Sequence, residues 1–245
     1  MSDDGKFIQS NTLLSECDDD DRRGFVKKVY AILATQLTAT FGCVAMVKFN
    51  DEMNASLADP ENSTAMAMFI TTLVLALVLQ CAIICCKNVA RAVPCNFITL
   101  SLFTACWAYI ISFICAQYDK DVVLMSSIST AAITISLTLY AMFTKTDFTQ
   151  LCGPFVCFAL LMIFTVQMLL SILSLFIFSW TDTWIPFAAG FCVIIYGLFL
   201  IIDTQLIVGG GRHELSIDDY VIGALVLYLD IIYIFIELLK IFGNR

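Results

Sequence analysis

Long apolar runs separated by short polar stretches dominate the sequence. Each run is close to the roughly 20 residues that a helix needs to cross a bilayer. Seven such runs cover 26–48, 65–86, 94–117, 122–144, 154–178, 184–208 and 219–242. Because the connections are short, the pattern predicts an all-α membrane domain of seven transmembrane helices over 26–245. A disordered, acidic cytosolic tail is expected over 1–25.

The composition favours a membrane protein over a soluble one. The chain is 60% hydrophobic and 14% charged, whereas soluble domains average about 25% charged residues. The net charge of −8 is concentrated in tails and loops, above all in the acidic run from Glu16 to Asp21. This balance argues against nucleic acid as a partner. We expect the lipid bilayer to be the main surroundings of the chain.

Cysteine and histidine usage gives no sign of a metal or redox centre. Most of the 11 cysteines fall inside apolar runs, where a thiol behaves as a small hydrophobic group. No CxxC pair occurs, and His213 is the only histidine. We therefore expect neither a zinc site nor a cofactor.

The basic residues predict the orientation in the membrane. Seven spans place the termini on opposite sides, and cytosolic loops carry the excess of lysine and arginine. Nine of the 13 basic residues fall on the N-terminal side, which predicts a cytosolic N-terminus and disfavours a G-protein-coupled receptor. Glycosylation sequons begin at Asn54 and Asn62, both on the non-cytosolic side. Asn62 is too near the membrane, so Asn54 is the expected site.

Three acidic residues are embedded in the apolar runs, namely Asp203, Asp230 and Glu237. An ionisable group at that depth costs on the order of 3 kcal/mol and marks a functional site by default. The short connection makes the last two helices antiparallel neighbours, so Asp203 and Asp230 are expected at similar depth. Two carboxyl groups that close would share a proton and titrate as a unit.

Three roles compete for this aspartate pair. The first is purely structural. The second is a cation site and pH-dependent gate, since carboxylates suit Ca²⁺ and protonation changes the repulsion between helices. The third is an aspartyl protease, but presenilin-like proteases show Tyr-Asp, Gly-x-Gly-Asp and Pro-Ala-Leu. Here Ile202 precedes Asp203, Leu229 precedes Asp230, and Pro-Ala-Leu is absent, so we expect no enzyme.

Several stretches resemble the transmembrane Bax-inhibitor-motif family, and within it the Lifeguard / glutamate-receptor-associated branch. They are "RRGFVKKVYAILATQL" (22–37), "CCKNVARAVPCNFITLSLFT" (85–104), "TKTDFT" (144–149), "IIDTQLIVGGGRHELSIDDYV" (201–221) and "LYLDIIYIFIELLKIFG" (227–243). The two aspartate stretches are the most specific. The resemblance implies a seven-helix bundle in which six helices surround a central last helix.

The resemblance also implies a function. Family members are associated with calcium leak from endoplasmic reticulum and Golgi stores and with suppression of apoptosis. In prokaryotic relatives an aspartate pair on the sixth and seventh helices forms a pH sensor beside the pore. The matching positions are Asp203 and Asp230. A basic residue of the second helix pairs with the sixth-helix aspartate in some members, and Lys87 or Arg91 is the candidate here.

Glu237 departs from the family pattern, which has an apolar or aromatic residue there. Two interpretations stay open. Glu237 is either a second station on a cation path, because it lies nearer the non-cytosolic end, or a surface residue paired with Lys240.

These observations together predict a pH-sensitive calcium (cation) leak channel of an intracellular membrane, the endoplasmic reticulum or the Golgi. It would regulate calcium stores and suppress apoptosis, with Asp203 and Asp230 as pH sensor, gate and metal ligands. Its expected partners are calcium ions, protons and apoptosis-regulating membrane proteins. The alternative is a non-conducting anti-apoptotic scaffold that acts through protein partners. A proton-coupled transporter is third.

Overall fold

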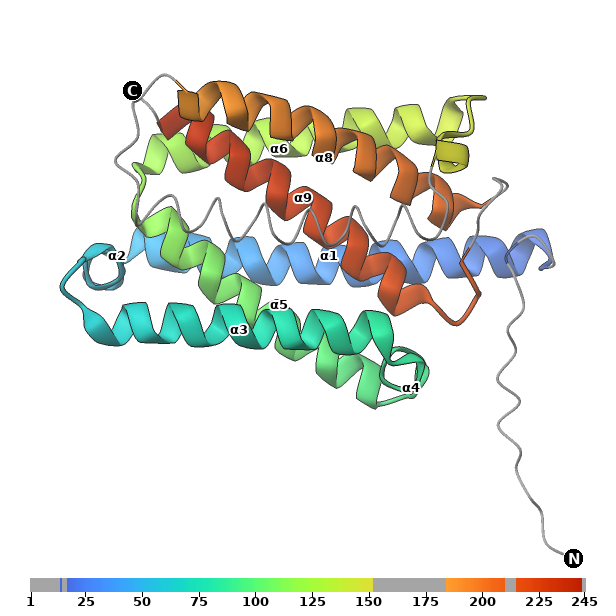
Figure 1. Ribbon diagram of the computed structural model, residues 1–245, viewed down its shortest axis with the longest axis horizontal. Coiled ribbons are helices and arrows are strands. Elements are labelled where there is room, and N and C mark those ends of the chain that lie inside the picture. Colours follow the sequence, from blue (N-terminus) through green and yellow to red (C-terminus); the bar gives the residue numbers. More distant parts are fainter. Residues whose placement is uncertain (1–13, 15–16, 152–183, 210–214, 244–245) are drawn as a thin grey trace, which may run out of the picture.

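The main secondary-structure elements of the described residues are all helices. The structure, a computed structural model, describes residue 14 and residues 17–151, 184–209 and 215–243. The elements are α1 (Asp19–Phe49), α2 (Asp51–Ala58), α3 (Ser63–Cys85), α4 (Lys87–Arg91), α5 (Cys95–Ala116), α6 (Lys120–Phe143), the 3₁₀ helix η2 (Phe148–Leu151), α8 (Trp184–Val208) and α9 (Tyr220–Gly243). Figure 1 shows the long helices lying side by side in one bundle.

Six helices in the described ranges are long and apolar enough to cross a membrane. They are α1, α3, α5, α6, α8 and α9. Five of them match the predicted runs to within about three residues at either end, while α1 begins earlier. The prediction of a multi-pass, all-α membrane protein is therefore confirmed. The remaining predicted run, 154–178, lies outside the described residues.

α1 begins at Asp19, inside the segment that the sequence assigned to a disordered tail. Its first turn holds Asp19, Asp20 and Asp21. Negative side chains are stabilising at a helix N-terminus, where the helix dipole presents its positive end. Hydropathy does not detect such a polar, solvated extension, which explains the difference.

Two short helices, α2 and α4, cap opposite ends of the bundle (Figure 1). Asn50 begins α2 and accepts hydrogen bonds from the backbone N–H groups of Glu52 and Met53, both at 3.1 Å. Such caps satisfy donors that a helix N-terminus leaves unpaired. α4 lies at the other end, between α3 and α5, where it also contacts α9. This arrangement brings α4 beside the start of the last helix.

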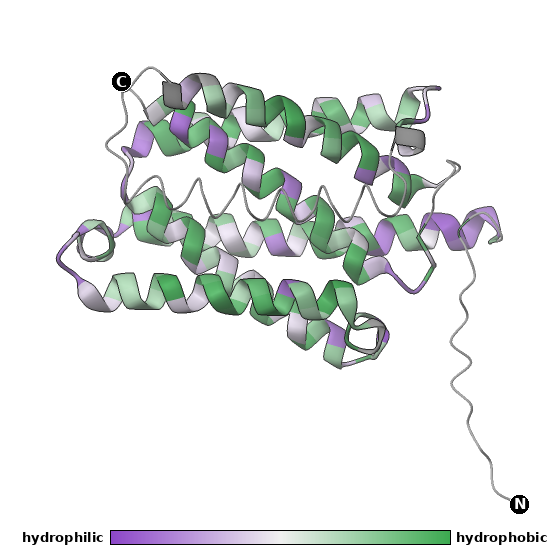
Figure 2. Ribbon diagram, viewed as in Figure 1, coloured by the Kyte–Doolittle hydropathy of each residue, from purple (hydrophilic) through white to green (hydrophobic). Residues whose placement is uncertain are grey.

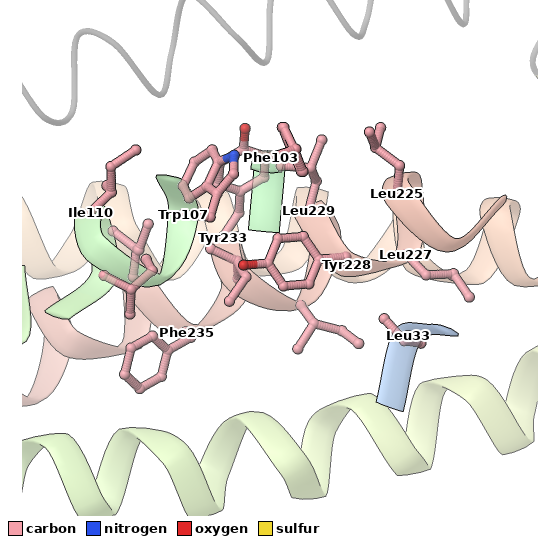
Figure 3. Packing of buried hydrophobic residues seen from close by; sticks show 14 of the residues in the cluster. Leu33, Phe103, Trp107, Ile110, Leu225, Leu227, Tyr228, Leu229, Tyr233 and Phe235 are labelled. Carbon is pink, nitrogen blue, oxygen red and sulfur yellow. The ribbon is translucent and has the colours of Figure 1, made fainter. Parts of the chain in front are cut away.

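α9 is the most buried of these spans. Within its apolar window 89% of the residues are buried, against 17–61% in the other described spans. It packs against α1, α5, α6 and α8. Figure 3 shows Tyr228 and Tyr233 of α9 packed with Phe103 and Trp107 of α5. α9 therefore occupies the core of the described bundle.

The outer helices expose apolar side chains. Those on α3 and α6 are Met68, Ile70, Val74, Leu75, Val78, Leu124, Met125, Ile128, Ile135, Leu139, Tyr140, Met142 and Phe143. In Figure 2 these helices are mostly green, whereas purple bands interrupt the buried helix α9. Polar groups inside and apolar groups outside are what a lipid environment requires.

A glycine and an arginine define the end of α8. Gly209 has φ +77°, a left-handed conformation typical of the residue that ends a helix. Arg22 of α1 donates from Nε to the carbonyl oxygen of Val208. A Cβ atom on Gly209 would lie 3.1 Å from Nη2 of Arg22. Gly209 therefore ends α8, and Arg22 holds that end against α1.

Candidate functional site

Asp203 of α8 and Asp230 of α9 meet in the core. The two helices form the most extensive helix–helix contact of the described bundle, as expected of antiparallel neighbours joined by a short connection. The side chains of Asp203 and Asp230 are hydrogen-bonded to each other. Asp230 is 4% exposed, whereas Asp203 is half-buried. The structure thus brings together the two acids that the sequence singled out.

A hydrogen bond between two carboxyl groups requires a proton on one of them. An ionised carboxylate only accepts, while a protonated carboxyl group also donates. Among the described residues no hydroxyl, amide or cation donates to Oδ2 of Asp230. Asp203 is the hydrogen-bond partner that the structure shows for Asp230.

Aromatic side chains enclose the aspartate pair. The rings of Tyr196 of α8 and Tyr233 of α9 lie 5.6 Å apart, and Trp107 of α5 lies 5.6 Å from Tyr233. Both phenols are close enough to Asp230 to interact electrostatically with it. Figure 3 shows Trp107 and Tyr233 in contact across α5 and α9. In such an apolar enclosure a change in charge carries a larger energy than it would in water.

Hydrogen bonds between helices cross the same core. Gln36 of α1 donates to Oγ1 of Thr104 of α5 at 3.0 Å. Thr40 of α1 and the hydroxyl of Tyr228 of α9 are hydrogen-bonded at 2.8 Å. Polar side chains commonly join helices within membranes in this way. We therefore assign Gln36 and Thr40 to helix packing.

Arg91 forms a two-point ion pair with Asp219, the residue before α9. Its Nε lies 2.7 Å from Oδ1, and its Nη2 lies 2.9 Å from Oδ2. The hydrogen bonds to Asp219 raise the pKa of Arg91 above its usual value. Oδ2 of Asp219 also accepts from the backbone N–H of Ser216 at 3.3 Å, as in a capping box.

The partner that the structure shows for Arg91 is thus at the start of α9. The family resemblance had made Arg91 a candidate partner of Asp203. The other basic candidate, Lys87, begins α4, and its side chain lies outside the described part of the chain. Arg91 therefore binds the residue just before α9, whereas Asp203 contacts the middle of α9.

Glu237 pairs with Lys240 inside the bundle. Nζ of Lys240 lies 2.9 Å from Oε1 of Glu237, and the two side chains are 5% and 7% exposed. Of the two open interpretations, the pairing with Lys240 is present, but it is buried and not at the surface. Tyr118, in the connection after α5, lies nearby, and burial above all raises its pKa to about 12.

The two sequons have different surroundings. Asn62 begins α3: its Oδ1 accepts from the N–H of Ala65 at 3.1 Å, and its Nδ2 donates to the backbone oxygen of Ser56 at 2.9 Å. Asn54 is half-buried in α2, and its Oδ1 accepts from Nζ of Lys48 at 3.0 Å. Asn62 is thus used as a helix cap, and glycosylation of Asn54 stays a prediction.

The metal-ligand role expected of Asp203 and Asp230 stays a prediction. Within the described ranges, no group of three or more His, Cys, Asp or Glu side chains could hold a metal ion. Ca²⁺ takes six to eight oxygen ligands, so two carboxyl groups would need water and backbone oxygens to complete its coordination.

Sequence reasoning missed the role of Gln205, two residues after Asp203. Its Oε1 accepts from the N–H of Phe148 at 2.9 Å, and its Nε2 donates to the carbonyl oxygen of Thr146 at 2.9 Å. Gln205 thereby joins α8 to the stretch 144–149. Gln205 lies in the stretch 201–221, and both this stretch and 144–149 carry the family resemblance. Their contact is a structural reason for the two stretches to occur in the same protein.

These features define a class of protein, namely a multi-pass membrane protein with a pair of carboxyl groups between two adjacent spans. Over residues 22–245 the chain matches the family described as "Inhibitor of apoptosis-promoting Bax1". The chain belongs to this Bax inhibitor-1 family, which confirms the predicted family. Membership identifies a membrane protein, not an enzyme, and implies an anti-apoptotic role.

Individual relatives cover most of the chain. Protein lifeguard 3 of Mus musculus is 31% identical over 224 residues, which are 91% of this chain and 70% of that protein. Protein lifeguard 3 of Homo sapiens is 32% identical over the same shares. Protein LIFEGUARD 4 of Arabidopsis thaliana is 30% identical over 224 residues, 90% of this chain and 85% of that protein.

Proposed function

We propose that this protein is a pH-sensitive calcium leak channel of an intracellular membrane, the endoplasmic reticulum or the Golgi. Through this leak it regulates calcium stores and thereby restrains apoptosis. The observation that carries the proposal is the hydrogen-bonded pair of Asp203 and Asp230, held inside the bundle between α8 and α9.

The proposed architecture completes the described bundle. Residues 154–178 supply a seventh span, and α9 is the central helix around which the others pack. The end that carries α4, η2 and the starts of α1 and α9 faces the cytosol (Figure 1). Support for this orientation comes from the basic residues near that end, among them Arg22, Arg23, Lys27, Lys28 and Arg91.

Proton loss from the aspartate pair is the proposed trigger. When one proton is shared, the pair holds α8 against α9. When the proton leaves, two carboxylates face each other, and two unit charges about 4 Å apart repel by about 4 kcal/mol at an effective dielectric constant of 20. An energy of about 1.4 kcal/mol changes an equilibrium tenfold. Deprotonation is therefore sufficient to displace α9 and change the leak.

Calcium flux from liposomes tests this proposal. Purified protein in calcium-loaded liposomes should leak at a rate that varies with pH. Asp203→Asn and Asp230→Asn replace a titratable carboxyl by a neutral amide, so each should hold the leak at the level that the wild type shows at low pH. Asp121→Asn removes an exposed carboxyl at the start of α6 and should leave the pH response unchanged.

Two results would contradict the proposal. The first is an unchanged pH response in both aspartate variants. The second is the absence of calcium flux at every pH from protein that still protects cells against apoptosis. In that second case the protein would be a non-conducting anti-apoptotic scaffold that acts through protein partners.

A further inference from the structure

Four free cysteines are exposed near one end of the bundle. They are Cys81, Cys85, Cys86 and Cys95. Cys106 and Cys115 are buried, as is usual for cysteine, since this residue type is among the most buried in proteins. The exposed group therefore requires a separate explanation.

Three of the exposed thiols lie where the helices leave the bilayer. Cys85 is the last residue of α3, Cys86 caps that helix, and Cys95 is the first residue of α5. α3 and α5 contain no charged residue, and Lys87 is the first cation after α3 in the chain. Because α3, α4 and α5 contact one another, the three cysteines share one end of this hairpin (Figure 1).

Other roles for cysteine fit these three residues poorly. Within the described part of the chain, none of the three forms a disulfide. Within the described ranges, no cluster of three metal-binding side chains exists there. Exposed apolar residues surround the hairpin turn, with Val93 68% and Ile98 63% exposed. The thiols therefore lie beside a surface suited to lipid.

We propose that Cys85, Cys86 and Cys95 are sites of S-acylation by long-chain fatty acyl groups. Cysteines next to a membrane span are the usual acceptors of this reversible modification. The thiolate sulfur attacks the carbonyl carbon of a fatty acyl-coenzyme A thioester, a new carbon–sulfur bond forms, and coenzyme A leaves as its thiol. The exchange of one thioester for another involves no oxidation or reduction.

The location of the hairpin supports this assignment. Acyl-coenzyme A is present in the cytosol, so the inference depends on the proposed cytosolic position of α4. Attached acyl chains would insert into the leaflet beside α3 and α5. Since the same hairpin carries Arg91, acylation would hold the Arg91–Asp219 ion pair close to the membrane surface. The modification would thus anchor α4, whose Arg91 forms the ion pair at the start of α9.

Thioester-dependent mass tagging of the full-length protein from cells tests the proposal. Free thiols are blocked, thioesters are cleaved with hydroxylamine, and the released thiols are labelled with a polyethylene glycol maleimide. The wild type should show up to three hydroxylamine-dependent steps in mass. The triple variant Cys85→Ser, Cys86→Ser, Cys95→Ser should show none, and an alkyne analogue of palmitate should label the wild type but not the triple variant.

Cys81→Ser is the matched control. Cys81 is also exposed and lies one turn before Cys85 on the same face of α3, about 6 Å deeper in the bilayer. Its substitution should leave the number of steps unchanged. The proposal fails if the wild type shows no hydroxylamine-dependent step, if the triple variant keeps its steps, or if Cys81→Ser removes one.

Discussion

Asp203 and Asp230 are chemically identical, but their positions give them different parts in the site. Asp230 is enclosed by α9 and its neighbours, whereas Asp203 is half-buried near the end of α8 that leads to Gly209. In the proposed gate, a proton that exchanges with water would reach the pair through Asp203, and Asp230 would determine whether the core of the bundle holds a charge.

Replacing Asp203 by an amide or by an apolar group should have different effects on stability. Asp203→Asn keeps a donor toward Asp230 and should unfold at nearly the wild-type temperature. Asp203→Leu leaves the buried carboxyl of Asp230 unpaired, which should lower the free energy of unfolding by roughly 1–3 kcal/mol. Thermal unfolding of detergent-solubilised protein at neutral pH measures both. Equal losses in the two variants would contradict the hydrogen-bonded pair.

Arg91 should stabilise the first turn of α9. Arg91→Ala removes two charge-assisted hydrogen bonds to Asp219, and should lower the free energy of unfolding by roughly 1.5–3 kcal/mol. It should also increase amide hydrogen exchange in the first turn of α9. Arg23→Ala, at an exposed position of α1, is the control and should change neither quantity. Unaltered exchange in Arg91→Ala would show that this ion pair does not hold the helix.

At the scale of elements, the apolar pattern predicted the described spans because lipid contact and helix length constrain them directly. Short polar helices escaped prediction. α2 depends on the cap that Asn50 provides, and the first turn of α1 depends on three acidic side chains at its N-terminus. Local interactions of this kind leave no periodic signal in hydropathy.

The end of α8 offers a test with a control in the same helix. Gly209→Ala places a side chain at φ +77° against Arg22, and should lower the free energy of unfolding by roughly 1–2 kcal/mol. Gly190→Ala adds a Cβ where, among the described residues, no atom beyond its own helical neighbours lies within 4 Å, so it should be neutral or stabilising by roughly 0.5–1 kcal/mol. Chemical unfolding of both variants measures the difference. Equal effects would contradict a special backbone requirement at Gly209.

For the candidate site, sequence reasoning succeeded where two helices are connected directly. The turn between α8 and α9 allowed depth to be compared by counting residues, which placed Asp203 beside Asp230. The contact of Arg91 with Asp219 depends instead on the direction that α4 takes after α3, and helix periodicity does not specify that direction. The burial of Glu237 could not be predicted from the sequence either, because the residues around Glu237 come from elements distant in sequence.

At the scale of the whole molecule, the orientation in the membrane can be checked through glycosylation. If the end that carries α2 faces the lumen, Asn54 should be glycosylated in cells. Asn54→Gln should then abolish the change in electrophoretic mobility that follows treatment with an amidase specific for N-linked glycans. Asn62→Gln should leave that change intact, because Asn62 caps α3. Loss of the change in Asn62→Gln alone would contradict this assignment.

The buried ion pair of Glu237 and Lys240 has an electrical consequence for α9. The helix carries three ionisable acidic or basic side chains, Asp230, Glu237 and Lys240, and the last two cancel. In the proposed gate, a membrane voltage would do little work on a movement of α9 while Asp230 shares a proton with Asp203. Once that proton left, each 100 mV would contribute up to about 2.3 kcal/mol per charge carried across the membrane. The shared proton would thus set how strongly voltage acts on α9.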